Sequence, residues 1–251
     1  MFHIISNSSI GHIDREEEQH VLNNNTEYII IAGNLSLTNK RTMLYAETLA
    51  TMYPNSHVIF NHGVLESYNG LYNRIEDGFD LHVNEFKKSP SNLYFPKGKC
   101  VGDYDFYCTI GWPTLIVEHN FQDSYFAKSL QKGMDQEIYI DDMLMSTYYT
   151  RNFTLENVIE ESNKEKIRVA EWLATDQGKP KILVSALGDQ CSSYVGKSTY
   201  KTFDGLDLTG ITWICGSDQD FVGDYRGAHV ISLPGRDRTR CVSQETMNLI
   251  L

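Results

Sequence analysis

Five short clusters of small and polar residues follow apolar runs in this chain, and their residue types bear directly on chemistry. The clusters are SNSS (6–9), AGN (32–34), NHGVLES (61–67), SALG (185–188) and CGSDQ (215–219). Loops at the carboxyl ends of parallel strands meet at one crevice, where α/β proteins place their sites. Carboxylates and imidazoles gathered there would bind metal ions or move protons. These clusters offer mainly amides, hydroxyls and glycines, which are polar but chemically mild.

The runs that precede or contain these clusters are expected to be strands, together with one further run near the end of the chain. The predicted strands are 2–6, 27–34, 57–61, 181–188, 211–217 and 228–234. Because these runs are apolar without alternation, we expect a sheet that is covered on both faces. The aromatic stretch 93–113 alternates with polar residues around glycines, which predicts a meander of short antiparallel strands.

Helical spacing of apolar residues predicts two helices that cross between these strands. The first spans 39–53 and ends before Pro54, with an apolar stripe at Met43, Leu44, Leu49 and Met52. The second spans 154–174, and its expected apolar stripe consists of Leu155, Val158, Ile159, Ile167, Ala170 and Leu173. The aromatic and acidic stretch 114–153 shows no strong period and is expected to be a cap or loop region within one domain, 1–251.

Composition restricts the class of protein. The chain has 251 residues, of which 41% are hydrophobic, and no segment approaches the roughly 18 apolar residues that span a bilayer. A net charge of −11 argues against nucleic acid as the main partner, and the basic run at Arg236, Arg238 and Arg240 is interpreted as a solvated loop. The five cysteines form no CxxC pair, and the N-terminus lacks the features of a signal peptide, so a reduced, cytoplasmic setting is expected.

Taken in order, the five clusters resemble the motifs of the calcineurin-like metallophosphoesterases, most of all their small bacterial and phage branch. SNSSIGH stands where that family has Ser-Asp-x-His, and IIIAGNLS stands at its Ala-Gly-Asp turn. NHGVLESY stands at its Asn-His-Glu motif, while VSALGD and TWICGSDQ stand at its later histidine motifs. The resemblance implies a four-layer α/β/β/α sandwich with two metal ions that clamp a phosphate between the loops. With this branch, a phage protein is one expectation, although the sequence does not name the host.

The residues that the resemblance implies for metal binding and proton donation are all replaced in this chain. Those positions hold Asn7, Ser9, Asn34, Val64, Leu65, Ala186, Cys215, Ser217 and Gln219. A pair of divalent ions needs anionic oxygens or neutral imidazoles, whereas Asn and Ser carry no charge and Val, Leu and Ala offer no ligand atom. The turn glycines Gly33, Gly63 and Gly216 are kept. We therefore expect the loops to retain their shape without catalytic residues, metal ligands or a cofactor.

Other residues near the clusters keep rival interpretations open. His62, Glu66 and Asp218 could make residual polar contacts in the former cleft. A rearranged site for a single metal ion could be assembled from acidic residues and histidines of these loops: His12, Asp14, His62, Glu66, Asp218, Asp220 and Asp224. Their spacing matches no metal motif, and aspartates in glycine-rich loops commonly belong to turns. Cys215 could be a nucleophile, but no neighbouring base lowers its pKa, so a buried and inert cysteine is expected.

The sequence thus predicts a pseudoenzyme that acts by binding a protein partner or by self-assembly as a homo-oligomer. Two alternatives stay open. One is a divergent metal-dependent phosphoesterase with a rebuilt site. The other is a protein that binds a nucleotide or phosphate in the former cleft without a metal. Membranes and nucleic acid are not expected as partners.

Overall fold

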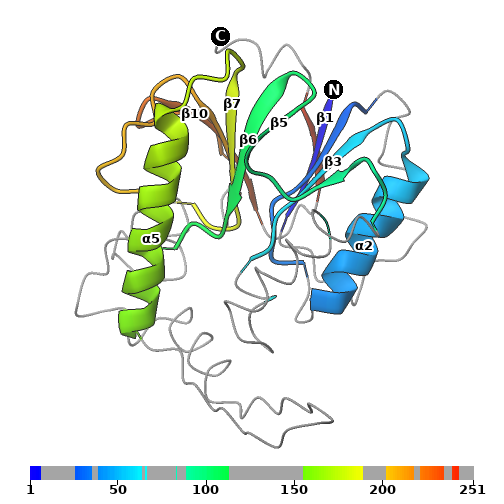
Figure 1. The fold of residues 1–251 in the computed structure, drawn as a ribbon, viewed down its shortest axis with the longest axis horizontal. Coiled ribbons are helices and arrows are strands. Elements are labelled where there is room, and N and C mark those ends of the chain that lie inside the picture. The colour runs from blue at the N-terminus through cyan, green and yellow to red at the C-terminus, as the bar shows by residue number, and fades with distance from the viewer. Residues whose placement is uncertain are drawn as a thin grey trace, which may run out of the picture.

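Two β-sheets face each other in the computed structural model of this chain, which has a mixed α/β fold (Figure 1). Strands outnumber helices, of which the described part contains two. The structure describes these residues: 1–6, 26–35, 39–63, 66, 83, 89–112, 155–188, 202–217, 221–234 and 239–242. The predicted cap or loop region, 114–153, lies outside them.

The first sheet has five strands in the order β11-β1-β2-β3-β4. Their bounds are β1 (Phe2–Ile5), β2 (Tyr28–Ile31), β3 (His57–Phe60), β4 (Leu93–Tyr94) and β11 (Thr239–Val242). Parallel pairing places Ile5 opposite Ile31, and Ile31 opposite Phe60. The carboxyl ends of three strands therefore lie at one edge of the sheet, as the sequence predicts. The antiparallel β11 contains Arg240, so the interpretation of that residue as part of a solvated loop is wrong.

The second sheet has six strands in the order β5-β6-β7-β8-β10-β9. Their bounds are β5 (Lys97–Val101), β6 (Tyr104–Thr109), β7 (Lys181–Ser185), β8 (Thr212–Ser217), β9 (Phe221–Tyr225) and β10 (Ala228–Pro234). The strands β6, β7, β8 and β10 are parallel, with Thr109 opposite Ser185 and Ser185 opposite Cys215. This sheet therefore also collects the ends of its central strands at one edge.

The predicted meander at 93–113 is only partly confirmed. The strands β5 and β6 do form an antiparallel hairpin with a bulge between Lys97 and Lys99. However, β4 pairs in parallel with β3 of the other sheet, since the chain changes sheet at Phe95 and Pro96. The alternation of aromatic and polar residues predicts one antiparallel meander, whereas the two ends of the stretch belong to different sheets.

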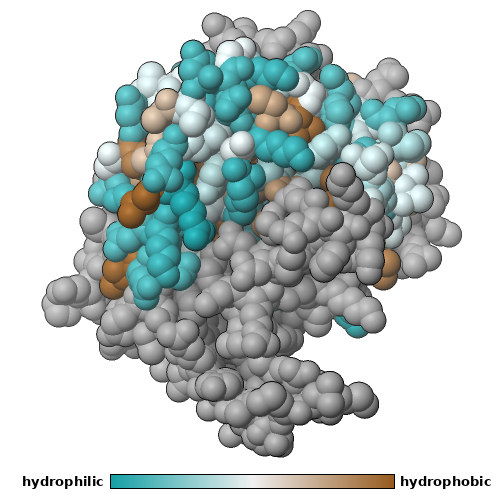
Figure 2. All heavy atoms as spheres, in the orientation of Figure 1, coloured by the Kyte–Doolittle hydropathy of each residue, from teal (hydrophilic) through white to brown (hydrophobic). Residues whose placement is uncertain are grey.

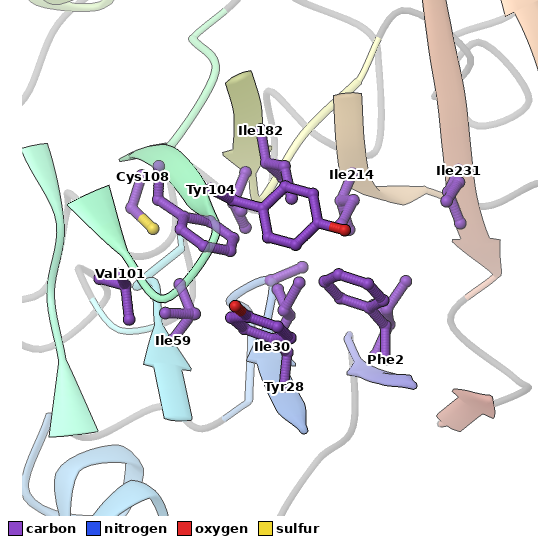
Figure 3. Close-up of a cluster of buried hydrophobic side chains, with 14 residues drawn as sticks. Phe2, Tyr28, Ile30, Ile59, Val101, Tyr104, Cys108, Ile182, Ile214 and Ile231 are labelled. Atoms are coloured by element: carbon purple, nitrogen blue, oxygen red, sulfur yellow. The ribbon is translucent and has the colours of Figure 1, made fainter. Parts of the chain in front are cut away.

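A large apolar cluster fills the space between the two sheets. In Figure 3, Phe2, Tyr28, Ile30 and Ile59 of the first sheet point toward residues of the second sheet. The residues contributed by the second sheet are Val101, Tyr104, Phe106, Cys108, Ile182, Val184, Ile214 and Ile231. Phe2 and Tyr28 stack with ring centroids 4.8 Å apart. Because the thiol of Cys108 is fully buried here, its pKa is raised to about 12, and it is no thiolate nucleophile at neutral pH.

Helix α2 (Asn39–Met52) packs against the outer face of the first sheet (Figure 1). Its bounds agree with the predicted helix, but its buried face differs from the predicted stripe. The residues that reach the core are Met43, Ala46, Leu49 and Ala50, whereas Leu44 is 61% exposed and Met52 is 47% exposed. Two of the four inward positions are thus held by alanine, and the predicted stripe shares only Met43 and Leu49 with the buried face.

Helix α5 (Leu155–Ala174) packs against the second sheet, and its predicted stripe is also wrong in part (Figure 1). Its buried face consists of Ser162, Glu165, Val169 and Trp172, whereas Ile159 and Ile167 are exposed. The Lys181 Nζ donates hydrogen bonds to the carbonyl oxygens of Trp172 at 2.8 Å and Leu173 at 2.6 Å, so a cation satisfies the helix C-terminus. Neither helix of the described chain combines the length and the hydropathy that crossing a bilayer would need.

Burial of His3 on β1 predicts a pH dependence of stability. The side chain is 1% exposed, and burial lowers its pKa from 6.5 to about 4. Between these values the unfolded chain binds a proton that the folded protein does not, so the free energy of unfolding falls as the pH drops from 6.5 to 4. The shift corresponds to roughly 3 kcal/mol. Urea unfolding of wild type and His3→Leu between pH 7 and 4 should show a shallower acid slope in the variant, and equal slopes would contradict the prediction.

Candidate functional site

The polar clusters of both sheets meet at the carboxyl ends of the strands, as the sequence predicts. Two asparagine side chains link the sheets across this edge. The Asn34 Nδ2 donates to the carbonyl oxygen of Ala186 at 3.2 Å, and the Asn61 Nδ2 donates to that of Thr109 at 2.7 Å. The loops after β2, β3, β6 and β7 are thus joined directly to one another. We call this region the strand-end site, defined by residues 32–35, 61–63, 109–112 and 185–187.

Glu66 holds the part of the strand-end site that belongs to the first sheet. Its carboxylate is 1% exposed and accepts backbone N–H bonds from Leu35 at 2.7 Å, Gly63 at 2.7 Å and Asn34 at 3.2 Å. It also accepts a bond from the Thr42 hydroxyl at 3.1 Å. Four donors to one carboxyl group fit an ionised, acceptor-only side chain. Glu66 therefore ties the loops after β2 and β3 to the first turns of α2. The sequence predicted that Glu66 could make residual polar contacts in the former cleft. In the structure, its polar contacts hold the protein's own loops together.

The loops around Glu66 are packed so closely that two of their glycines have no room for a Cβ atom. A Cβ atom at Gly63 would meet the Asn34 Oδ1 and would lie 2.5 Å from the Asn34 backbone nitrogen. A Cβ atom at Gly33, where φ is +95°, would lie 2.8 Å from both the Ala186 Cβ and the His62 carbonyl oxygen. Glycine is needed at both positions because backbone rather than a flexible side chain occupies the space.

Replacing Gly63 by alanine is expected to lower the free energy of unfolding by about 2 kcal/mol, since the added methyl group forces the two loops apart. Gly223→Ala is the matched control, because its Cβ would meet only ring carbons of Phe221 at 3.4 Å or more. Denaturant unfolding of both variants measures the difference. Equal stabilities of the two variants would show that the loops are not packed as described.

Glu165 of α5 holds the part of the site that belongs to the second sheet. Its carboxylate is buried and accepts backbone N–H bonds from Ile110 at 3.1 Å, Gly111 at 3.1 Å and Trp112 at 2.9 Å. It also accepts a bond from the Thr109 hydroxyl. Like Glu66, Glu165 thus receives three backbone amides and one threonine hydroxyl. Two equivalent carboxylate anchors therefore fix the strand-end loops, one on each sheet.

Neither Glu165 nor the loop 109–112 was among the site residues predicted from the sequence. A signal was present, because Glu165 lies three residues after Ser162 and four before Val169 on the buried face of the helix. A carboxylate on such a face needs donors. Asn61 was likewise not singled out, although it lies within the cluster NHGVLES.

Two buried polar atoms that directly follow strands of the first sheet have no hydrogen-bond partner among the described residues. They are the Oγ of Ser6, directly after β1, and the Oδ1 of Asn61, directly after β3. Both residues are fully buried. By strand alternation, Ser6 and Asn61 share the inter-sheet face of the first sheet with Ile4, Ile59 and Ala32. Buried polar atoms are rarely left unsatisfied, so each of these two atoms, which lie on either side of β2, is a position at which a water or a polar ligand could form a hydrogen bond.

The remaining predicted residues fall into three groups. Asn7, Ser9, Val64, Leu65, Asp218 and Gln219 lie outside the described residues, and of Ser217 only the backbone at the end of β8 is described. The Cys215 side chain is buried in the cluster beneath α5, which confirms its predicted burial. His62 is fully buried, and its ring stands edge-on to Phe95 with centroids 5.7 Å apart. The His62 side chain therefore lies on the face of the first sheet that α2 covers. The Asn61 side chain lies on the opposite face, toward the second sheet.

The described donors do not fit the pair of metal ions that the sequence resemblance implied. No group of three or more His, Cys, Asp or Glu side chains within the described ranges is arranged to hold a metal ion. The Glu66 oxygens are occupied by four protein donors. The Ala186 side chain carries no ligand atom, and the side-chain amide of Asn34 donates a hydrogen bond to the carbonyl oxygen of Ala186. No chemical step through a metal ion is therefore derived from these residues.

Comparison with known proteins corrects the family assignment. No family model matches the chain, and no curated protein sequence matches it either. The assignment to the calcineurin-like metallophosphoesterases is wrong, because no family model supports it and the structural similarity that is found is to a phosphopantetheinyl hydrolase. Short glycine-containing turns after apolar strands, without the ligands that distinguish one family from another, are a weak signature.

A solved structure nevertheless shares the fold. The chain is similar to the crystal structure of phosphopantetheinyl hydrolase (PptH) from Mycobacterium tuberculosis, with a TM-score of 0.57. The match covers 94% of this chain and 90% of the hydrolase, at 12% sequence identity. At this identity the similarity concerns the fold alone. The fold class of this chain is mixed α/β, with two sheets.

Proposed function

We propose that this chain is a non-catalytic binding protein, which acts by binding a protein partner or by self-assembly. The observation that carries the proposal is the use made of the polar groups at the strand ends. Glu66, Glu165 and the amide of Asn34 are all engaged with the protein's own backbone. A general acid or base must reach a substrate, and a metal ligand must offer a lone pair. Groups that hold loops together serve neither purpose.

The proposal includes the finer architecture. We propose a four-layer α/β/β/α sandwich, with α2 and α5 as the outer layers of the described chain. Three apolar clusters support it, one between the sheets and one beneath each helix. In such an arrangement the strand-end loops close one end of the inter-sheet core, and the outer helix faces remain available for contacts with other molecules.

A second candidate function is favoured by the two unpartnered atoms. The Ser6 Oγ and the Asn61 Oδ1 could hydrogen-bond a small polar ligand without a metal ion. A neutral or weakly charged ligand suits the site better than a polyanion, because the chain carries a net charge of −11. Thermal shift measurements with nucleosides, nucleotides and inorganic phosphate test this candidate. A rise in melting temperature that disappears in Asn61→Ala would establish it.

The test of the main proposal is a direct search for metal and turnover. Purified full-length protein is analysed for bound metals and then assayed with an aryl phosphodiester and a phosphopantetheinyl thiol ester or phosphodiester, with and without Mn²⁺. The expected result is no stoichiometric metal and no turnover above background. Asn61→Ala and Ser6→Ala serve as site controls. Turnover that these variants reduce would overturn the proposal, and turnover that they leave unchanged would indicate a contaminating enzyme.

A further inference from the structure

The carboxylate of Glu165 is held by one short segment of chain, as a ligand is held by a receptor. One carboxylate oxygen accepts hydrogen bonds from the Thr109 hydroxyl and from the Ile110 N–H at 3.1 Å. The other oxygen accepts bonds from the N–H groups of Gly111 at 3.1 Å and Trp112 at 2.9 Å. Consecutive residues thus supply all of these donors, two to each oxygen.

The backbone conformation of the loop 109–112 is of a kind that binds anions. Gly111 has a φ of +77°, and a residue in this left-handed region lets successive N–H groups converge on one point. Such converging N–H groups bind phosphates and other anions in many proteins. Hydrogen bonds to an ionised acceptor are also stronger than those between neutral groups. The loop therefore has the chemistry of an anion site, whichever carboxylate fills it.

Contacts made by the carbonyl groups of the loop fix its shape independently of the carboxylate. The Thr109 carbonyl oxygen accepts bonds from the Asn61 Nδ2 at 2.7 Å and from the Ala186 N–H at 3.2 Å. The Ile110 carbonyl oxygen accepts a bond from the Leu187 N–H at 2.9 Å. The carbonyl groups are thus bonded to residues that follow strands of both sheets. The N–H groups of the loop should therefore keep their positions when the carboxylate is removed.

The site around Glu66 differs in this respect. Its N–H donors belong to two loops, since Asn34 and Leu35 follow β2 whereas Gly63 follows β3. Glu66 itself joins these two loops, so the carboxylate is part of what positions its own donors. The loop 109–112 is the clearer case of a site that exists without its ligand.

Glu165 carries its charge on the inner face of α5, although the outer face of this helix meets solvent. The surface over α5 is mostly hydrophilic (Figure 2), and the exposed side chains of Lys164 and Glu160 pair at 2.8 Å. Glu165, in contrast, is 4% exposed. Burial of a carboxylate is costly unless its hydrogen bonds are satisfied. The loop therefore binds the carboxylate well enough to offset the loss of hydration.

We propose that the loop 109–112 is a binding site for a carboxylate, which Glu165 occupies from within the chain and which a small carboxylate ion occupies when that side chain is removed. Glu165→Ala keeps the Cβ atom, and the atoms that it removes are those of one acetate ion. Because the side chain is buried, the space that it leaves lies inside the protein. The inference goes beyond the proposed function, since it depends neither on a partner nor on the absence of catalysis.

Wild-type protein should not bind acetate at this loop. Glu165 is already held beside the donors, so it competes without the loss of translational freedom that a free ion suffers on binding. The net charge of −11 also disfavours anions in general. This repulsion is screened beyond about 3 Å at 1 M salt, whereas the donors of the loop act at contact distance. Acetate at high concentration can therefore reach an emptied site.

Thermal unfolding of full-length Glu165→Ala in sodium acetate tests the site, with sodium chloride replaced stepwise at neutral pH and constant ionic strength. With a dissociation constant of roughly 10–100 mM, acetate at about 1 M should raise the midpoint by about 3–10 °C relative to chloride. The rise should level off as the site fills. Acetamide has nearly the same shape but is neutral and carries N–H donors of its own, so it should give no such rise.

Glu165→Gln is the matched control, because its side chain fills the same space and leaves no room for acetate. Glu160→Ala is the second control, since it removes a carboxylate that is 60% exposed on the same helix. Wild type and both controls should show only the general effect of the salt on burial. Subtracting the wild-type shift from that of Glu165→Ala therefore isolates binding at the loop.

The inference is overturned if acetate and chloride act alike on Glu165→Ala, or if Glu165→Gln shows an equal rise in acetate. If Glu165→Ala does not fold in chloride, its refolding from urea is compared in the two salts, with sucrose added to both because this osmolyte favours the folded state. Refolding that needs acetate supports the inference, and equal recovery or equal failure in both salts contradicts it. The turnover assay on wild type is independent of each of these results.

Discussion

Replacing Glu165 by glutamine is expected to lower the free energy of unfolding by about 3 kcal/mol. The carboxylate accepts bonds from the backbone N–H groups of Ile110, Gly111 and Trp112 and from the Thr109 hydroxyl. Glutamine has nearly the same shape, but one of its two terminal atoms is a donor. At least one pair of donors would then face each other in a buried site, at a cost of about 1–3 kcal/mol for each unsatisfied group.

Thermal unfolding measures this loss, and a fall of roughly 6–12 °C in the midpoint is expected for a chain of this size. Glu160→Gln is the control on the same helix, because Glu160 is 60% exposed and its carboxylate pairs with Lys164 at the surface. This control should leave the midpoint nearly unchanged. If Glu165→Gln behaves like Glu160→Gln, the carboxylate does not anchor the loop 109–112.

Replacing Glu66 by glutamine should have an effect of similar size on the first sheet. Its carboxylate joins the loop after β2, the loop after β3 and Thr42 of α2. A donor at either terminal position of the side chain would face Leu35 N–H and the Thr42 hydroxyl on one side, or Gly63 and Asn34 N–H on the other. We expect a loss of about 3 kcal/mol, together with faster amide exchange at Leu35 and Gly63 than at β1.

Glu47→Gln is the matched control for Glu66→Gln, since Glu47 lies half-buried on α2 and accepts a bond from the Ser89 hydroxyl. Glutamine can still accept that bond, so little change is expected. Hydrogen exchange followed by mass spectrometry separates the two variants. Unchanged exchange at Leu35 and Gly63 in Glu66→Gln would mean that the loops keep their positions without the carboxylate.

The two anchors explain how the strand-end loops can hold one conformation without bound metal ions. Each loop presents backbone N–H groups that need an acceptor when they are buried. Glu66 supplies it on the first sheet and Glu165 on the second, and the amides of Asn34 and Asn61 then join the two sheets. This use of the polar groups supports the proposal of a non-catalytic protein, because both carboxylates and the amide of Asn34 are engaged with the protein's own backbone.

Local patterns in the sequence were enough to locate most of the regular elements. Apolar runs placed β1, β2, β3, β7, β8 and β10, and helical spacing placed α2 and α5 to within one residue at most ends. These features depend on neighbouring residues, whose spacing records which side chains must be buried. Residue types alone also predicted that the strand ends would be poor in metal ligands, since Asn34 and Ala186 bring amide and methyl groups wherever the loops lie.

The buried faces of the helices and the partners of the site residues were decided by contacts between segments that are distant in the sequence. Which face of α2 is buried was decided by its packing against the first sheet, where Ala46 and Ala50 face inward and Leu44 faces outward. The family resemblance failed because turn glycines recur wherever strands end at a crevice. The role of Glu165 required the loop 109–112, more than 50 residues earlier, to come within hydrogen-bonding distance. No local pattern encodes a carboxylate's partners, because they are fixed only when the helix and the sheet pack together.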